Sequence, residues 1–198
     1  MPPRHASGKR GAEAEMRLPP GLRLMFPPDR IAAAVDAAAA SAAPMLAGAR
    51  NPAAVCVLKG AFVFCADLIR RIPMDLDVFF IQASSYGEGT SSSGEVKIRL
   101  DLSADEIRGR DVLLVEDIVD TGRTLAEIRR RLAALGARVA CSAVLLRRRR
   151  AASAPAEGPD VFGFEIGSEF VVGYGLDLAG KYRNLPCIAA VEEKPDQG

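Results

Sequence analysis

The stretch Val112-Leu-Leu-Val-Glu-Asp-Ile-Val-Asp-Thr-Gly-Arg-Thr-Leu125 decides how the chain folds and where its chemistry lies. Residues 112–115 are apolar and begin and end with valine, which predicts a buried strand of a parallel sheet. Residues 125–135 repeat apolar side chains at helical spacing, which predicts an amphipathic helix. Three carboxylates and then a turn of mostly small or hydroxyl-bearing residues lie between them: Glu116, Asp117 and Asp120, then Thr121, Gly122, Arg123 and Thr124.

The turn between this strand and this helix suits a phosphate group. The first amides of a helix have no partner within the helix and lie at the positive end of its dipole. Gly122 lets the backbone approach a ligand closely, and Thr121 and Thr124 add hydroxyl donors. No G-x-x-x-x-G-K-[ST] sequence occurs, so the turn is not a Walker-type loop.

The carboxylates beside the turn need a different task, because they would repel a phosphate. Glu116 and Asp117 can accept hydrogen bonds from a sugar diol or help to hold a cation, and Asp120 can take a proton. A phosphate site, a diol acceptor and a proton acceptor within one turn describe a site for a ribose 5-phosphate. The residues alone also leave open an ordinary acidic loop with a threonine cap.

The segment Val115-Glu-Asp-Ile-Val-Asp-Thr-Gly-Arg-Thr124 resembles the phosphoribosyl-diphosphate motif of the purine phosphoribosyltransferases, specifically the hypoxanthine(-guanine) branch. The resemblance extends over roughly residues 22–192. It implies the type I fold: an α/β domain with a mainly parallel twisted sheet flanked by helices, a small hood and a flexible β-hairpin loop. It also implies transfer of 5-phosphoribosyl from phosphoribosyl diphosphate (PRPP) to N9 of hypoxanthine, and of guanine, with Mg²⁺ as cofactor and a homodimer or homotetramer as the assembly.

Composition limits the other classes of function. With 26 basic and 25 acidic residues the net charge is +1, which gives no electrostatic case for a nucleic-acid or membrane surface. A broad basic face would favour a phosphoribosyltransferase-fold regulator of pyrimidine genes that binds RNA. A transferase for another base, such as xanthine, stays open, because the residues do not rank hypoxanthine, guanine and xanthine.

Domain organisation and cellular compartment follow from the same counts. We expect a disordered, Pro/Gly-rich tail at residues 1–20, a single domain at 21–193 and a short tail at 194–198. The four cysteines lack C-x-x-C spacing, which favours free thiols in a reducing cytoplasm. The only histidine, His5, lies in the expected tail, which excludes a histidine-based dyad or metal site.

A second strand-turn-helix unit precedes the central stretch. Residues 53–58 predict a buried strand and residues 61–72 a helix, with Lys59 and Gly60 between them. Ligands of open α/β sheets bind at the carboxyl ends of the strands, so Lys59 is expected to share a crevice with Glu116. A solvated lysine is the ordinary alternative. In the family that the chain resembles, this Leu-Lys-Gly turn contacts pyrophosphate and has an unusual peptide geometry before the lysine.

Residues 84–94 contain three glycines and no apolar aliphatic side chain, which predicts a mobile loop. The runs 74–83 and 95–100 on either side predict the two strands of a long hairpin. The loop is either a linker or a lid that excludes water from a bound substrate. The resemblance favours the lid and assigns Ser85 and Tyr86 to the pyrophosphate site.

Four arginines, residues 147–150, follow the strand predicted at 138–146. Such a run is usually a solvated turn or a nucleic-acid patch. In the family that the chain resembles, a lysine at or next to this point donates to the 6-oxo group of the base. The nearest match is Arg147, with Arg148 and Arg149 as alternatives. Arginine keeps the charge and the donor but is bulkier and fork-shaped.

The C-terminal part contributes residues that on sequence alone fit ordinary core or surface positions. By resemblance, Phe170 stacks on the purine and Val171 contacts its edge, while Asp177 is linked to the metal and Arg183 to pyrophosphate. Together the residues and the resemblance assign catalysis to Asp120, the 5′-phosphate to Asp120, Thr121, Gly122, Arg123 and Thr124, and the ribose hydroxyls to Glu116 and Asp117. They assign pyrophosphate to Lys59, Gly60, Ser85, Tyr86 and Arg183. They assign the purine to Arg147, Phe170, Val171 and Asp177, and Mg²⁺ to Glu116, Asp117 and Asp177.

The remaining runs predict the rest of the fold. Short apolar segments at 22–26 and 187–191 predict strands, and residues 31–46 predict a helix with Asp29 as its N-cap. Residues 101–110 are expected to form a polar connection without regular structure.

Overall fold

The computed structural model describes residues 17–85, 96–99, 101–149 and 158–192. The expected tails at 1–20 and 194–198 lie mostly or wholly outside these ranges. The elements in chain order are β1 (Leu22–Phe26), α1 (Pro28–Met45), β2 (Ala53–Leu58), α2 (Phe62–Ile69), β3 (Asp77–Ser85), β4 (Val96–Arg99), α3 (Ala104–Ile107), β5 (Asp111–Val119), α4 (Arg123–Ala134), β6 (Arg138–Arg148), β7 (Val161–Ile166), β8 (Val171–Val172) and β9 (Ile188–Val191).

The larger sheet has the strand order β4-β3-β2-β5-β6-β7. Its strands are parallel from β3 to β7, and β4 returns antiparallel to β3. The expectation of a mainly parallel sheet is therefore confirmed. The chain moves outward in one direction from β2 to β3 and in the other from β5 to β7. Ligands of such sheets bind outside the carboxyl ends of the strands at this reversal, which here lies between β2 and β5.

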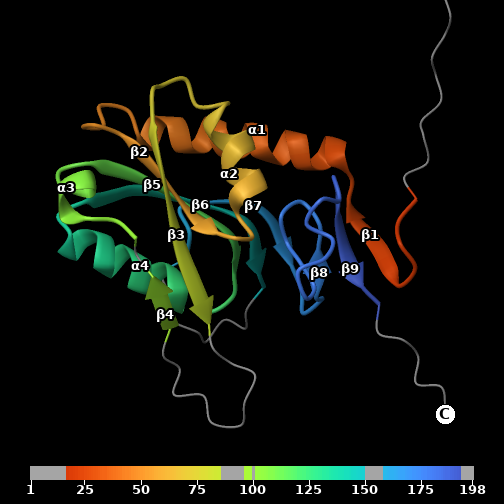
Figure 1. The fold of residues 1–198 in the computed structure, drawn as a ribbon. Coiled ribbons are helices and arrows are strands. Elements are labelled where there is room, and N and C mark those ends of the chain that lie inside the picture. The colour runs from red at the N-terminus through yellow and green to blue at the C-terminus, as the bar shows by residue number, and fades with distance from the viewer. Residues whose placement is uncertain (1–16, 86–95, 100, 150–157, 193–198) are drawn as a thin grey trace, which may run out of the picture.

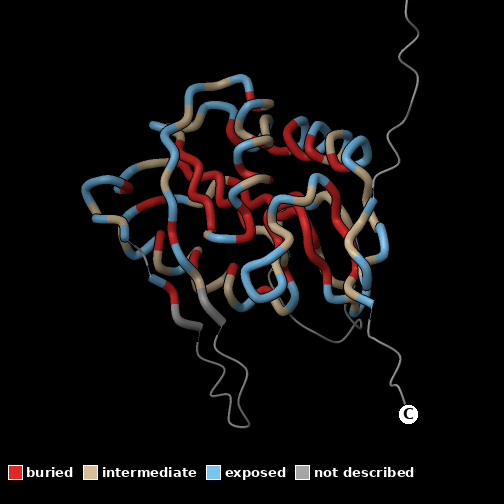
Figure 2. The backbone as a smooth tube through the Cα atoms, turned by 45° about the vertical axis from the view of Figure 1, so that its right-hand side comes forward, coloured by how far each residue is buried: buried red, intermediate tan, exposed pale blue. Residues whose placement is uncertain are grey.

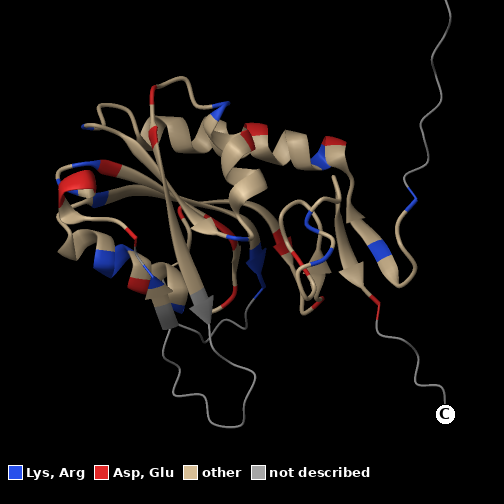
Figure 3. Ribbon diagram, viewed as in Figure 1, with Lys and Arg blue, Asp and Glu red and all other residues tan. Residues whose placement is uncertain are grey.

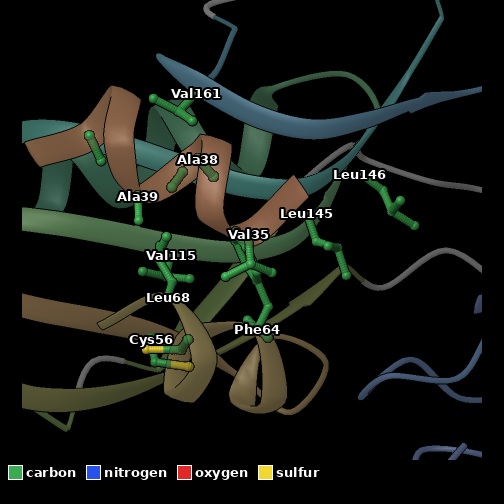
Figure 4. Packing of buried hydrophobic residues seen from close by; sticks show 14 of the residues in the cluster. Val35, Ala38, Ala39, Cys56, Phe64, Leu68, Val115, Leu145, Leu146 and Val161 are labelled. Carbon is green, nitrogen blue, oxygen red and sulfur yellow. The ribbon is translucent and has the colours of Figure 1, made fainter. Parts of the chain in front are cut away.

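Helices cover both faces of this sheet (Figure 1). On one face α1 and α2 pack with the strands in an apolar cluster, where Val35, Phe64 and Leu68 point toward strand residues such as Val115 (Figure 4). On the other face α3 and α4 supply a second cluster that includes Ile107 and Ile128. Buried residues concentrate along the central strands (Figure 2), so β2 and β5 form a firm base for the residues at their ends.

A smaller antiparallel sheet, β1-β9-β8, joins the two ends of the described chain into the expected hood. Leu22 pairs with Val191 in β9, and Val171 of β8 pairs with Ala190. The rings of Phe26 and Phe164 stack with their centroids 3.9 Å apart, which connects the hood to β7 of the larger sheet. The hood therefore packs against β7 at one edge of the larger sheet.

Several sequence-based boundaries were wrong, for reasons that depend on distant partners. The strand expected at 112–115 runs on to Val119, because β6 continues to pair with it as far as Val119 and Arg147. The polar connection at 101–110 contains α3, which Ser103 and Glu106 cap reciprocally. Asp29 is not the N-cap of α1, since Pro27 occupies that place and Asp29 lies in the first turn.

Candidate active site

A cleft of about 490 Å³ opens at the carboxyl ends of β2 and β5. It extends toward a smaller cleft of about 390 Å³ with which it shares four residues, Leu58, Lys59, Ala83 and Arg183. The residues of the main cleft that the sequence singled out come from both strand ends, the turn into α4 and the hood, and are Lys59, Gly60, Glu116, Asp117, Asp120, Thr121, Gly122, Thr124, Asp177 and Arg183.

The turn into α4 has the form expected for a phosphate site. Gly122 is the N-cap residue of α4 and has a φ of 74°, a left-handed backbone conformation that residues other than glycine rarely adopt. The hydroxyl of Thr121 accepts a hydrogen bond from the amide of Arg123 at 3.3 Å. Because α4 begins at Arg123, the positive end of its dipole lies at the cleft wall formed by Gly122 and Thr124.

Glu116 and Asp117 belong to β5 itself rather than to a loop. Glu116 is 5% exposed, and its Oε2 atom has no hydrogen-bond partner among the described residues. Burial, with a smaller contribution from the charge of Asp117, raises the pKa of Glu116 to about 8. Burial also raises the pKa of Asp117, although its Oδ1 accepts a hydrogen bond from the amide of Ile118 at 2.8 Å. A buried acceptor without a partner is costly, and a ligand hydroxyl or a cation would relieve that cost.

The Lys59-Gly60 turn lies against this acidic pair. The peptide bond between Leu58 and Lys59 is cis, which confirms the unusual geometry expected before the lysine. A Cβ atom added at Gly60 would lie 1.5 Å from Oδ2 of Asp117, so no larger residue fits there without moving the carboxylate. The turn therefore brings the exposed cation of Lys59 into the same cleft as the buried Glu116 and the half-buried Asp117, as the shared sheet edge predicted.

The hood contributes a linked pair of charges to the same cleft. Arg183 contacts Asp177 at 2.5 Å between Nη2 and Oδ1, and it donates through Nη1 to the carbonyl oxygen of Gly175 at 2.6 Å. Asp177 Oδ2 also accepts a hydrogen bond from the amide of Gly180 at 2.7 Å. The charge of Arg183 offsets part of the effect of burial on Asp117, but the pKa of that carboxyl still lies above its ordinary value. The hood thus places one cation opposite the acidic pair.

The structure separates the arginines at the end of β6. Arg147 contacts Glu165 at 2.7 Å and lies over the ring of Phe162, 3.7 Å from its centroid, so its side chain is held on β7. Arg149 contacts the same glutamate. Arg148 instead reaches within 4.0 Å of Asp120 and donates to the carbonyl oxygen of Glu169 at 3.1 Å.

This geometry does not support Arg147 as the base donor, because its guanidinium is occupied on β7. Arg148 lies between the cleft residue Asp120 and the residue that precedes Phe170. Phe170 is 51% exposed, so its ring is accessible, whereas Val171 is buried in β8. Ser85 is the last residue of β3, and Tyr86 lies outside the described residues.

The chain matches the phosphoribosyl transferase domain family over residues 28–178. It belongs to that family. The hypoxanthine phosphoribosyltransferase of Escherichia coli (strain K12) is 46% identical over 137 residues, which are 68% of this chain and 75% of that protein. A solved structure of the hypoxanthine phosphoribosyltransferase of Trypanosoma cruzi superposes with a TM-score of 0.76 at 35% identity, covering 89% of this chain and 95% of that one.

The bifunctional protein TilS/HprT of Listeria innocua is 48% identical over 143 residues. These residues are 72% of this chain but 22% of that protein, so the chain spans about a fifth of the length of this relative. The comparisons confirm the type I phosphoribosyltransferase fold and the resemblance drawn from the central stretch.

The phosphoribosyltransferase cleft has carboxylates but no closed metal cage. Within the described ranges, no group of three or more His, Cys, Asp or Glu side chains is arranged to hold a metal ion, so Glu116, Asp117 and Asp177 do not form one by themselves. This is compatible with Mg²⁺, which is usually bound by one or two carboxylates together with substrate phosphates and waters. The unpartnered Oε2 atom of Glu116 is the observation that fits a cation or a hydroxyl at this point.

Two features of this cleft could not be predicted from the sequence. The sequence made Arg147 the nearest match for the base donor, whereas in the structure Arg147 contacts Glu165 of β7 and Arg148 reaches within 4.0 Å of Asp120. The contact between Gly60 and Asp117 joins two separate strands, and no local pattern predicts it.

Glu116→Gln should make the unliganded phosphoribosyltransferase less sensitive to high pH. The folded-state pKa of about 8 lies above the ordinary 4.5, so the folded state binds an extra proton between these values and stability falls as pH rises through them. Thermal or urea unfolding should show the variant gaining about 3 kcal/mol over the wild type between pH 5.5 and pH 8.5. The same difference at both pH values would contradict the raised pKa.

Proposed function

We propose that the chain transfers the 5-phosphoribosyl group of PRPP to N9 of hypoxanthine, and of guanine, and releases pyrophosphate. The observation that carries this proposal is the convergence in one cleft of the phosphate turn at Gly122, the carboxylates of Glu116 and Asp117, and the cations of Lys59 and Arg183. The similarity to the hypoxanthine phosphoribosyltransferase of Escherichia coli supports hypoxanthine as the acceptor.

In this proposal the turn from Asp120 to Thr124 binds the 5′-phosphate through the first amides of α4 and the threonine hydroxyls. Glu116 and Asp117 accept hydrogen bonds from the ribose hydroxyls. Such bonds would supply donors to the buried Oε2 atom of Glu116 and favour the ionised form of the carboxyl. Binding of the sugar is therefore coupled to deprotonation of this pair.

Transfer builds positive charge on the ribose ring while negative charge leaves with pyrophosphate. Lys59 and the backbone at Gly60 bind the leaving group from β2, and Arg183 binds it from the hood. Bound Mg²⁺, held by substrate oxygens together with Asp177, Glu116 or Asp117, would offset the charge of the phosphates. The family resemblance assigns Ser85 and Tyr86 to this group, and a lid there would exclude water, which would otherwise hydrolyse the activated sugar.

Asp120 exchanges a proton with N7 of the purine as N9 becomes bonded to the ribose. Its side chain is 63% exposed, so a base in the cleft can reach it. Phe170 stacks on the base and Val171 contacts its edge through the backbone. Arg148 donates to the 6-oxo group, because it lies between Asp120 and the segment before Phe170. A 6-oxopurine satisfies this donor, whereas the amino group of adenine does not.

Arg148→Ala should raise KM for hypoxanthine about tenfold or more, the scale of a lost hydrogen bond to a charged donor. Arg147→Ala is the matched control and should change KM less than twofold, because Arg147 is held by Glu165 and Phe162. Steady-state kinetics at saturating PRPP measures both. A larger effect for Arg147→Ala than for Arg148→Ala would reverse the assignment.

The regulator alternative finds less support. Basic and acidic residues are interspersed along the same elements rather than gathered on one face (Figure 3).

In the part of the chain that the structure describes, no helix is long and apolar enough to cross a membrane. The cysteines are free and buried, which supports the reducing cytoplasm as the compartment. We also propose that the protein assembles as a homodimer or a homotetramer.

The direct test is pyrophosphate release from PRPP in the presence of Mg²⁺ and hypoxanthine. Release that requires both the base and the protein supports the proposal. Binding of PRPP without release, together with binding of RNA, would instead favour the regulator.

A further inference from the structure

Tyr174 connects the hood to the helix that follows the pyrophosphate turn. Its side chain is 7% exposed, and its hydroxyl donates a hydrogen bond of 2.5 Å to Oδ2 of Asp67. Asp67 lies on α2, which begins two residues after Gly60. The two residues are 107 positions apart in the sequence, so the bond joins elements that local structure does not connect.

Asp67 is itself held in place. The guanidinium of Arg71 donates to the backbone carbonyl of Asp67 at 2.9 Å and also contacts Asp36 of α1. Burial raises the pKa of Asp67, but hydrogen bonds from Tyr174 and Arg70 outweigh it, so the pKa lies below its ordinary value. Tyr174 therefore donates to an ionised acceptor on a fixed helix, and such charge-assisted bonds are stronger than neutral ones.

The backbone beside Tyr174 carries this anchoring to the cleft. The amide of Tyr174 donates to the carbonyl oxygen of Leu185 at 2.8 Å, and the amide of Gly175 donates to the carbonyl oxygen of Arg183 at 3.0 Å. The side chain of Arg183 donates back to the carbonyl of Gly175 at 2.6 Å. A Cβ atom added at Gly175 would lie 2.3 Å from the carbonyl oxygen of Gly60, so the hood backbone rests directly on the turn.

We infer that Asp67 and Tyr174 are positioning residues that hold Arg183 and Asp177 at a fixed place over the Lys59-Gly60 turn, and so set the affinity for the diphosphate part of PRPP. This inference rests on the proposed function. The two side chains do not line the cleft, and they act through Arg183 and the contact between Gly175 and Gly60. The competing account is a hydrogen bond that contributes to stability alone.

Tyr174→Phe tests the inference because it removes only the hydroxyl group. We expect KM for PRPP to rise about tenfold while kcat stays within about threefold. Asp67→Asn keeps an oxygen acceptor for Tyr174 but removes its charge, so KM for PRPP should rise by a smaller factor than in Tyr174→Phe. Ser103→Ala is the control for general destabilisation, since it removes the capping hydrogen bonds of α3 far from the cleft, and it should leave KM for PRPP unchanged. A Tyr174→Phe variant that loses thermal stability with unchanged KM would overturn the inference.

Hydrogen exchange separates this outcome from failure of the proposed function. Amide exchange across residues 175–185 should become faster in Tyr174→Phe than in the wild type and in Ser103→Ala, whether or not the protein turns over any base. If the wild type releases no pyrophosphate but the exchange still changes as expected, the proposed function fails and the anchoring stands. Unchanged exchange in Tyr174→Phe overturns the anchoring whatever the activity.

Discussion

Asp120→Asn should lower turnover with hypoxanthine about 10²-fold or more, the scale of a lost acid/base group. Asparagine has nearly the shape of aspartate but cannot take the proton of N7. The phosphate turn is formed by the backbone of Gly122, the start of α4 and the threonine hydroxyls, and the substitution leaves these in place. Binding of PRPP should therefore be largely kept.

Calorimetric titration with PRPP and Mg²⁺, combined with steady-state turnover, measures both parts of this expectation. Asp29→Asn is a suitable control, because Asp29 is exposed on the first turn of α1, outside the cleft, and the same chemical change there should have no effect. Turnover unchanged by Asp120→Asn would remove Asp120 from the mechanism. Loss of PRPP binding would instead make it a phosphate-site residue.

Gly60→Ala should reduce kcat/KM for PRPP on a similar scale, because it displaces the side chain of Asp117. The new methyl group would lie 1.5 Å from Oδ2 and 2.5 Å from Cγ of Asp117. Asp117 has a short side chain that is already bonded to the amide of Ile118, so it cannot move without losing that bond or shifting the turn. We expect at least about a 10²-fold loss in kcat/KM for PRPP, because small misplacements of binding groups have effects of this size.

Gly158→Ala is the matched control for this variant. A Cβ atom at Gly158 meets nothing within 4 Å, and its backbone does not have a positive φ. This variant should keep wild-type kinetics. Circular dichroism should show that both variants fold. If Gly60→Ala folds and binds PRPP as tightly as the wild type, the close contact with Asp117 does not shape the site.

Much of the fold could be predicted from short stretches of sequence. The buried strands β2 and β5 and the helices after them follow from apolar runs and helical periodicity, which are local signals. The strand ends could not be predicted in this way. Glu116 and Asp117 are polar, yet they remain in β5 because β6 pairs with Glu116 and, beyond Asp117, with Ile118 and Val119. Similarly, α3 is a single short turn whose capping box was not recognised in a polar segment.

In the candidate site, too, local sequence signals predict some features, while others depend on contacts between distant elements. The carboxylates, the turn and Lys59 were expected at one sheet edge, and the structure brings them together with Asp177 and Arg183. The choice between Arg147 and Arg148 depends on Glu165 and Phe162 of β7, which a reading of β6 alone does not include. The anchoring of Tyr174 on Asp67 likewise depends on tertiary contact and has no sequence signal of its own.

The most direct test of the account is to identify the nucleotide that the protein makes from PRPP and Mg²⁺ when hypoxanthine, guanine, xanthine and adenine are offered together. Liquid chromatography with mass spectrometry distinguishes the four possible products. The account predicts inosine or guanosine 5′-monophosphate, with pyrophosphate in equal amount, and no adenosine 5′-monophosphate. Adenosine 5′-monophosphate as the main product, or no nucleotide at all from a protein that binds PRPP, would contradict it.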